Sequence, residues 1–349
     1  MNGKRIVLLL GTLVLICLLL STCQSPEITS AKVYLQQNNL PAAEEQLMIA
    51  MGKEPANPEV PFLLATTIYG PQRDWKKAGE MLDKAEELSA DYKSKVENQR
   101  KQYWGELYND GANTFNEAGR ALFEMEKDSI FNLAADKFLK SIQMKADEAT
   151  SYNGIVKCYY SAKDTQKVEK FAKMAFDNNV FDEDVIDIYC RILWETERKD
   201  QAFQVLDEQL AKNPNITDLQ LLKIEFLANS ERVEEALAAA KNLVNNNPDN
   251  IDYRFNLAQI YAMAEDYESA QYEYQKLLSQ NPDDLEILIR ITNAAYQSED
   301  WVMAEEYARR LIAIEEDNRF GYQILFNSLM KQQRKEEAEE YFKIYKSLD

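Results

Sequence analysis

Apolar residues in the C-terminal two thirds of the chain recur three or four positions apart, in pairs of segments separated by short polar stretches. One pair begins at Thr217, and the apolar positions of its first segment are Leu219, Leu222, Ile224, Phe226 and Leu227. After a polar turn, the second segment carries Val233, Ala236, Leu237, Ala240, Leu243 and Val244. This spacing predicts two amphipathic helices. Asn247-Pro248 ends the second one, because proline disfavours the helical conformation of the residue before it.

The same plan returns every 34 residues. One position, just after the turn between the two helices, is occupied by Ala134, Val168, Ala202, Ala236, Ala270, Ala304 and Ala338. The dipeptide Asn-Pro keeps the same step at residues 213–214, 247–248 and 281–282. Self-similarity at a fixed period of this length indicates a repeat protein, in which each hairpin buries its apolar face against its neighbours.

The content of turn-forming residues agrees with a helical chain. Only 10 Gly and 9 Pro occur among 349 residues, and no Pro lies between Gln72 and Asn213. A chain rich in β-strands needs more turn residues than this, so composition favours an all-α fold.

The unit 251–284 carries the residues that identify the repeat. It has small residues at Ala258 and Ala270, aromatic residues at Tyr261 and Tyr274, and Pro282 near its end. Small residues allow the two helices of a hairpin to approach closely. This pattern resembles the tetratricopeptide repeat (TPR). The resemblance implies an all-α, right-handed superhelical solenoid of about nine TPR-like helix hairpins, preceded by an N-terminal signal or anchor segment.

The repeat pattern also suggests domain boundaries. Residues 149–349 hold six TPR repeats, at 149–182, 183–216, 217–250, 251–284, 285–318 and 319–349. Residues 23–92 look like two further repeats in a shifted register. Ala78 of the second N-terminal repeat matches Ala134, but the two are 56 residues apart, 22 more than one repeat. The segment 93–148 contains this insertion, and its apolar spacing predicts a repeat with an elongated helix. A linker between two sub-arrays is the alternative.

The N-terminus has the features of an export signal. Lys4-Arg5 precede an apolar run from Ile6 to Leu20. The following Leu20-Ser21-Thr22-Cys23 resembles the lipobox of bacterial lipoprotein precursors, although threonine before the cysteine departs from the usual Gly, Ala or Ser. The resemblance implies that residues 1–22 are a signal peptide and that Cys23 is lipidated. An uncleaved transmembrane anchor is the alternative, and both predict a membrane-attached chain facing the periplasm or exterior.

Charge and missing residue types exclude several classes of function. The formal net charge of −19 disfavours nucleic acid as a partner. The chain has no histidine, which removes imidazole bases and metal ligands. It has no phosphate-binding glycine loop, so we expect no catalytic residue, metal or cofactor. Cys158 and Cys190 lie on the first helices of consecutive repeats. A disulfide between them stays open, beside the simpler interpretation of two buried thiols.

The TPR resemblance assigns a concave binding groove to the first helices of the repeats. The groove positions carried onto this chain are Asn153, Lys157, Tyr160, Asp187, Arg191, Trp194, Phe255, Gln259, Asn293, Tyr296, Gln323 and Asn327. Amides can pair with the main chain of a peptide while aromatic rings bury its side chains. The aromatic residues could equally fill space between helices. At the other end of the chain, Tyr341 and Leu348 face the position of a tenth repeat that the sequence lacks, which predicts a contact with a partner there.

The function that follows is a non-catalytic scaffold for protein–protein interactions. It is anchored to a membrane on the extracytoplasmic side, and the lipoprotein resemblance suggests cell-envelope assembly or secretion. A glycan-binding or enzyme-accessory envelope protein that works through Trp194 is the alternative.

Overall fold

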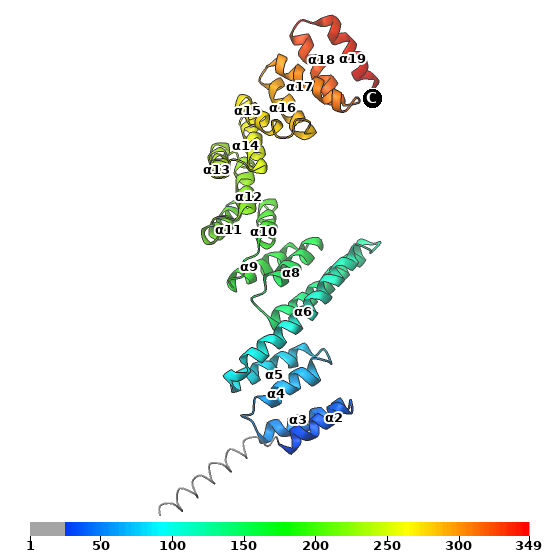
Figure 1. The fold of residues 1–349 in the computed structure, drawn as a ribbon, viewed down its shortest axis with the longest axis vertical. Coiled ribbons are helices and arrows are strands. Elements are labelled where there is room, and N and C mark those ends of the chain that lie inside the picture. Colours follow the sequence, from blue (N-terminus) through cyan, green and yellow to red (C-terminus); the bar gives the residue numbers. More distant parts are fainter. Residues whose placement is uncertain (1–24, 349) are drawn as a thin grey trace, which may run out of the picture. The chain divides into compact units, whose positions relative to one another are not determined.

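A computed structural model of the chain describes residues 25–348, and these residues form 18 α-helices and no strand (Figure 1). The predicted all-α repeat fold is confirmed. The signal segment 1–22 and Cys23 lie outside the described residues. Within residues 25–348, no helix has both the length and the apolar character needed to cross a bilayer.

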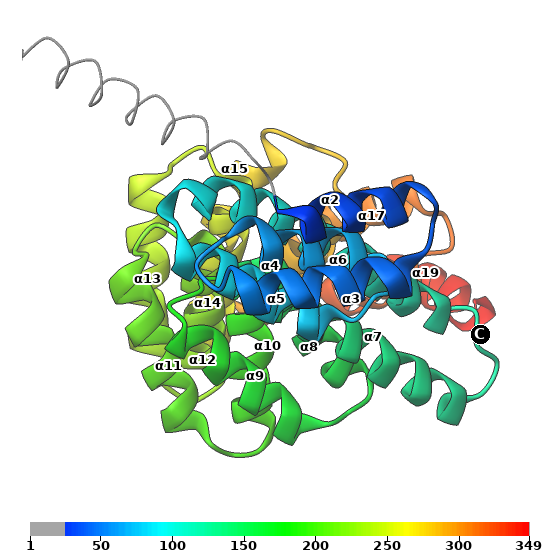
Figure 2. The same ribbon diagram turned by 90° about the horizontal axis from the view of Figure 1, so that it is seen from below.

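The chain divides into two compact units, and the first extends to Arg198. Its described helices are α2 (Pro26–Gln36), α3 (Leu40–Lys53), α4 (Glu59–Leu63), the π-helix η1 (Leu64–Tyr69), α5 (Trp75–Leu88), the 3₁₀ helix η2 (Ala90–Tyr92), α6 (Lys93–Ala118), α7 (Glu124–Met144), α8 (Ala149–Ser161), α9 (Thr165–Asp177) and α10 (Glu183–Glu195). Consecutive helices pack as antiparallel neighbours, as α2 and α3 do in both views of Figures 1 and 2.

The second unit begins at Lys199. Its helices are α11 (Lys199–Lys212), α12 (Thr217–Ala228), α13 (Val233–Asn246), α14 (Ile251–Met263), α15 (Tyr267–Leu278), α16 (Leu285–Gln297), α17 (Trp301–Ile314), α18 (Arg319–Lys331) and α19 (Lys335–Ser347). Each helix from α12 onward packs against the next one in sequence, so the contacts of this unit are local along the chain.

The turn inside each hairpin is built by one backbone device. After α14, the N–H of Asp266 donates to the carbonyl of Tyr261 at 2.9 Å, and the N–H of Glu265 donates to Ala262 at 3.1 Å. This is the Schellman arrangement, which requires a left-handed residue at Glu265. The carboxylate of Asp266 then caps α15 by accepting from the N–H of Ser269 at 3.1 Å. Left-handed residues recur every 34 positions, with φ between 58° and 65°, at Lys163, Glu197, Glu231, Glu265, Glu299 and Gln333.

The small residues that recur every 34 positions, here called the ladder, lie inside the fold. All seven ladder positions are fully buried: Ala134, Val168, Ala202, Ala236, Ala270, Ala304 and Ala338. The last six lie near the start of the second helix of their hairpin, whereas Ala134 lies in the middle of the longer helix α7. The periodic alanine therefore reflects close packing, since a larger side chain would separate the helices.

The segment 93–148 folds as one hairpin of unusually long helices. Helix α6 has 26 residues and α7 has 21, whereas every other α-helix in the described residues has at most 14. The two pack along each other. Helix α6 is tied to its neighbours on both sides. The Tyr103 hydroxyl donates to the carbonyl of Ala65 at 2.9 Å, and the Trp104 indole donates to Ser151 at 2.8 Å.

Cys158 and Cys190 are both buried thiols in the first unit. Burial raises the pKa of Cys158 to about 12 and also raises that of Cys190, because a thiolate would lose its hydration there. These two residues behave as small apolar core residues, and the disulfide that the sequence left open is not formed.

Candidate functional site

The structure places six of the predicted groove residues on α8 and α10 of the first unit. Asn153, Lys157 and Tyr160 lie on one face of α8, and the matching positions of α10 hold Asp187, Arg191 and Trp194. None of the six is buried. Tyr160 is the most exposed of the six, with 43% of its surface exposed.

The polar members of this face bind residues of their own unit. The Asn153 amide donates to Asp182 at 2.9 Å and to Asp184 at 2.7 Å, and the Lys157 ammonium donates to Asp184 at 2.7 Å. Hydrogen bonds from Lys157 and Asn153 hold the pKa of Asp184 below its usual value. Burial instead raises the pKa of Asp182. A ligand that used Asn153 or Lys157 would have to displace these contacts.

The pair Asp187 and Arg191 is also satisfied within the chain. The Arg191 Nε lies 3.1 Å from each carboxylate oxygen of Asp187, one helical turn away on α10. Such exposed pairs contribute little to stability, so their exchange for a ligand contact costs little.

A cavity of about 260 Å³ adjoins this face between α6, α7 and α8. Asn153 and Lys157 line it together with Tyr108, Phe115 and Phe138, which the sequence analysis did not single out. The sequence held one signal of this site, the two glycines Gly111 and Gly154 inside helices. A Cβ added at either position would lie 2.7–2.8 Å from the Phe138 ring. Glycine is unfavourable inside helices, so its occurrence at two such positions marks the close approach of a large ring.

The second unit holds the other six predicted residues, on the first helices of three consecutive hairpins. Phe255 and Gln259 lie on α14, Asn293 and Tyr296 on α16, and Gln323 and Asn327 on α18. Asn293 and Gln323 are exposed, and the other four are half-buried. The Tyr296 ring meets Trp301 edge-on at 5.3 Å between centroids, and Phe255 meets Tyr274 at 6.1 Å.

Three amides of this face form a periodic row. Gln259, Asn293 and Asn327 are 34 residues apart, so they occupy the same position of successive repeats. In the part of the chain that the structure describes, the side chains of these three residues and of Gln323 make no hydrogen bond. We call Gln259, Asn293 and Asn327 the amide row. Each can donate and accept at once, which is what the main chain of a bound peptide requires.

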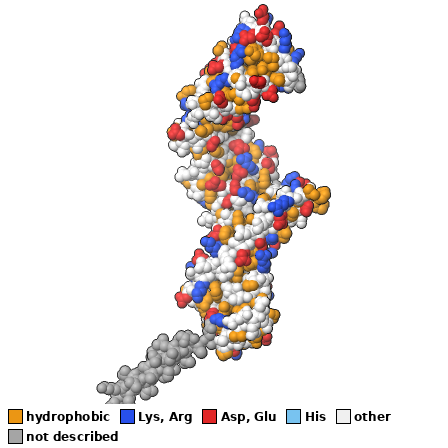
Figure 3. All heavy atoms as spheres, turned by 45° about the vertical axis from the view of Figure 1, so that its right-hand side comes forward, with side chains coloured by type: hydrophobic (Ala, Val, Ile, Leu, Met, Phe, Trp, Pro, Cys, Tyr) orange, Lys and Arg blue, Asp and Glu red, His pale blue; other side chains and the backbone are white. Residues whose placement is uncertain are grey.

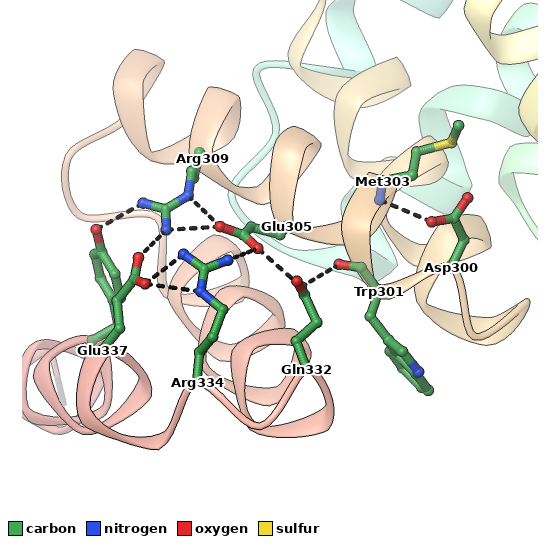
Figure 4. A network of polar contacts seen from close by, with 9 residues as sticks. Asp300, Trp301, Met303, Glu305, Arg309, Gln332, Arg334 and Glu337 are labelled. Atoms are coloured by element: carbon green, nitrogen blue, oxygen red, sulfur yellow. Dashed lines mark hydrogen bonds and ion pairs between the residues drawn. The ribbon is translucent and has the colours of Figure 1, made fainter.

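The C-terminal helix is held by a network of charged groups (Figure 4). The Arg309 guanidinium on α17 donates to Glu305, to Glu337 and to the hydroxyl of Tyr341, the last at 2.8 Å. Arg334 bonds to Glu305 at 2.6 Å and to Glu337. Burial opposes the charge of Arg309, yet its hydrogen bonds to Glu305, Tyr341 and Glu337 raise its pKa. Tyr341 therefore has a role inside the fold, and Leu348 lies half-buried just beyond α19.

The model of the ChAPs family (Chs5p-Arf1p-binding proteins) matches residues 96–317, which is more than half of the chain. The chain belongs to this family. The ChAPs match spans α6 to α17, so it includes the face on α8 and α10 and the α14 and α16 part of the second face, and it ends before α18. No curated protein matches the chain.

Solved structures similar to this ChAPs member are TPR proteins. One is the C-terminal part of a TPR repeat-containing protein from Cytophaga hutchinsonii, with a TM-score of 0.56, 16% identity, and coverage of 69% of this chain and 95% of that chain. Others are a tetratricopeptide repeat protein from Parabacteroides merdae (TM-score 0.46, 12% identity, 71% and 93% coverage) and PilF from Pseudomonas aeruginosa (TM-score 0.43, 15% identity, 55% and 88% coverage). At 16% identity, the likeness to the Cytophaga hutchinsonii structure shows the fold alone, and that fold is the TPR fold.

Proposed function

We propose that this chain is a non-catalytic scaffold that binds an extended segment of another protein along α14, α16 and α18. The observation that carries the proposal is the amide row, Gln259, Asn293 and Asn327, whose hydrogen-bonding groups have no partner among the described residues. Unused amides that repeat with the period of the fold are suited to a ligand whose polar groups also repeat.

The spacing of the helices fits a peptide main chain. Helices α16 and α18 contact each other directly. Helices in contact lie roughly 8–10 Å apart, which is the length of about three residues of an extended chain. Asn293 on α16 and Asn327 on α18 would then meet every third peptide group. Phe255 and Tyr296 lie on the same helices and offer apolar surface for the side chains between them.

The family membership supports protein as the class of ligand. The family's description names proteins that bind Chs5p and Arf1p. For this chain we infer a protein partner without assigning its identity. The net charge of −19 favours a partner segment that carries basic residues.

A crosslinking pull-down from native membranes tests this proposal. We expect the wild-type chain to retain one protein in stoichiometric amount, and the triple variant Gln259→Ala/Asn293→Ala/Asn327→Ala to lose it. The control Asn245→Ala/Gln280→Ala removes exposed amides from α13 and from the turn after α15, so it should retain the partner. Retention by the triple variant, or recovery of polysaccharide alone, would refute the proposal.

We also propose that the chain is attached to a membrane on its extracytoplasmic side through a lipid on Cys23. The basic pair, the apolar run and the lipobox-like sequence at the N-terminus support this. An uncleaved N-terminal anchor is the alternative. Incorporation of a labelled fatty acid distinguishes them: label that persists in Cys23→Ala would rule out this site, and a mature chain that begins at residue 23 would rule out the anchor.

The contact that the sequence predicted at the C-terminal end belongs to the same proposal. Because Arg309 holds Tyr341, the apolar groups left for a partner are Leu348 and the more exposed Ile344. Leu348→Glu should weaken such a contact, whereas Tyr341→Phe should change only local stability. An unchanged set of partners in Leu348→Glu would exclude this contact.

A further inference from the structure

The long hairpin in the first unit extends beyond its neighbours. At roughly 1.5 Å per residue, α6 and α7 reach nearly twice as far as the helices of 11–14 residues around them. Figure 1 shows the connection between α6 and α7 extending past the ends of α5 and α8. This extension is where the sequence departs from the 34-residue period, between Ala78 and Ala134.

The tip of this extension is apolar. Leu122, Phe123 and Met125 are exposed to 88%, 71% and 86%, the three highest values among the large apolar residues that the structure describes. We call these three residues the tip. Figure 3 shows orange side chains gathered at the end of the projection. Three adjacent apolar side chains almost fully in water are unfavourable, and contiguous patches of this kind mark interaction sites.

The two helices of the hairpin also contact each other away from the tip. The helices are held below it by other residues, including Phe115 and Phe131, whose rings lie 5.3 Å apart. The tip is convex, so it complements a hollow surface.

The second unit has such a hollow on its own surface. A cavity of about 360 Å³ lies between α11, α12 and α13, and its apolar wall consists of Phe203, Leu210, Ile224, Leu227, Ala239 and Leu243. We call it the α11–α13 cavity. Its size is at the lower end of the range for ligand pockets, roughly 300–1,000 Å³, which suits one or two large side chains.

The charges around the α11–α13 cavity are neutralised within the chain. Lys223 pairs with Asp207 at 2.5 Å, and Arg232 pairs with Glu235 at 2.7 Å. A charged ligand is therefore not needed to neutralise these groups at the rim of the cavity. An apolar group can enter without leaving a charge unpaired, and apolar surface is what the tip provides.

We propose that the tip of one copy of this chain inserts into the α11–α13 cavity of a second copy. The two surfaces differ, so the contact is head-to-tail, and a copy bound at its tip keeps an open cavity for another. The contact is small compared with the roughly 800 Å² that each partner buries in a stable interface. In addition, two copies that each have a net charge of −19 repel one another. The association is accordingly weak, and it builds chains of copies only where the protein is concentrated.

Disulfide trapping in the native membrane tests the contact with the full chain. Two copies with different tags are expressed together, one carrying Phe123→Cys and the other Ala239→Cys, and the membranes are treated with a mild oxidant. We expect a crosslinked species containing both tags. Addition of Leu122→Ser and Met125→Ser to the first copy should lower its yield at least tenfold, and these exposed positions leave the fold unaffected.

Two control pairs of cysteines test whether the crosslink is specific for the tip and the cavity. Ala238 adjoins Ala239 on α13 but is exposed outside the cavity, and Val302 on α17 is an exposed apolar residue far from the tip in sequence. Ala238→Cys with Phe123→Cys, and Ala239→Cys with Val302→Cys, should give little product. Equal yields from these pairs would overturn the proposal, as would a predominant crosslink between two Phe123→Cys copies, which indicates tip-to-tip contact.

Two further outcomes would also overturn it. If Phe123→Cys forms no crosslink and is protected from a membrane-impermeant maleimide, the tip is buried in lipid. If it forms no crosslink and reacts with that maleimide at the rate of Val302→Cys, the tip is free in solution.

Discussion

The left-handed residue in each hairpin turn offers a direct test of how these repeats are stabilised. Glu265 has φ 58°, and its N–H already donates to Ala262. A residue with a Cβ pays about 1–2 kcal/mol in this conformation, whereas glycine adopts it freely. Glycine loses about 0.5–1 kcal/mol more through its larger backbone entropy in the unfolded chain. We therefore expect Glu265→Gly to stabilise the fold by about 0.5–1 kcal/mol.

Charge makes a second contribution that must be separated from backbone strain. Glu265 lies at the C-terminus of α14, where a negative charge is unfavourable by about 0.3–1 kcal/mol. The variant Glu265→Gln removes the charge and keeps the Cβ, so it reports this contribution alone. Asparagine tolerates the left-handed region better than most residues, so Glu265→Asn should lie between the Gln and Gly variants.

The assay is thermal and urea unfolding followed by helical circular dichroism. For a unit of this size, 1 kcal/mol corresponds to a shift in Tm of about 2–4 °C. We expect stability to increase in the order wild type, Gln, Asn, Gly, and the same order at Glu299. A glycine variant less stable than the Gln variant would refute the argument from backbone strain.

Three further predictions concern the first unit. Gly111→Ala should destabilise it by about 1–3 kcal/mol, because the new Cβ would lie 2.8 Å from the Phe138 ring. On the same helix, a Cβ at Gly105 meets nothing within 4 Å, so Gly105→Ala should stabilise the unit by about 1 kcal/mol. Urea unfolding of both variants measures these changes. Hydrogen bonds from Arg198 and Lys173 lower the pKa of Glu169 from 4.5 to about 2, so its contribution is present above pH 4.5 and is lost as pH falls towards 2. With 23% of that side chain exposed, we expect Glu169→Gln to cost about 1–2 kcal/mol at pH 7 and no more than about 0.5 kcal/mol at pH 2, by unfolding at both pH values. Cys158 should react with a thiol reagent at pH 8 only after urea is added, since burial raises its pKa to about 12; rapid labelling of the folded chain would contradict this.

The architecture could be predicted from the sequence because the packing of each hairpin requires the same residue types every 34 positions. Ala270 and Ala304 must be small where two helices cross, and both are fully buried. The position of each groove residue on a first helix followed from the same period. What they bind did not follow: Asn153 and Lys157 pair with acids of α10 and its cap, whereas Asn293 and Gln259 are left without a partner among the described residues.

Other features could not be derived from the repeat pattern. The left-handed residues Glu231, Glu265 and Glu299 are not glycines, so the usual signal for this conformation was missing. The insertion between Ala78 and Ala134 has no counterpart in the other repeats, so its register could not be copied from them. Apolar residues at helical spacing usually indicate a core, and nothing local in the sequence reveals that Leu122 and Met125 lie beyond it.

The central claim is that a protein partner binds along the amide row. Photo-crosslinking from single sites in native membranes measures this most directly. A photoreactive residue in place of Asn293, exposed on α16, should crosslink to one protein, and the same residue in place of Asn245, exposed on α13, should not. A crosslink from Asn245 alone, or none from Asn293 while the chain is intact and folded, would contradict the claim.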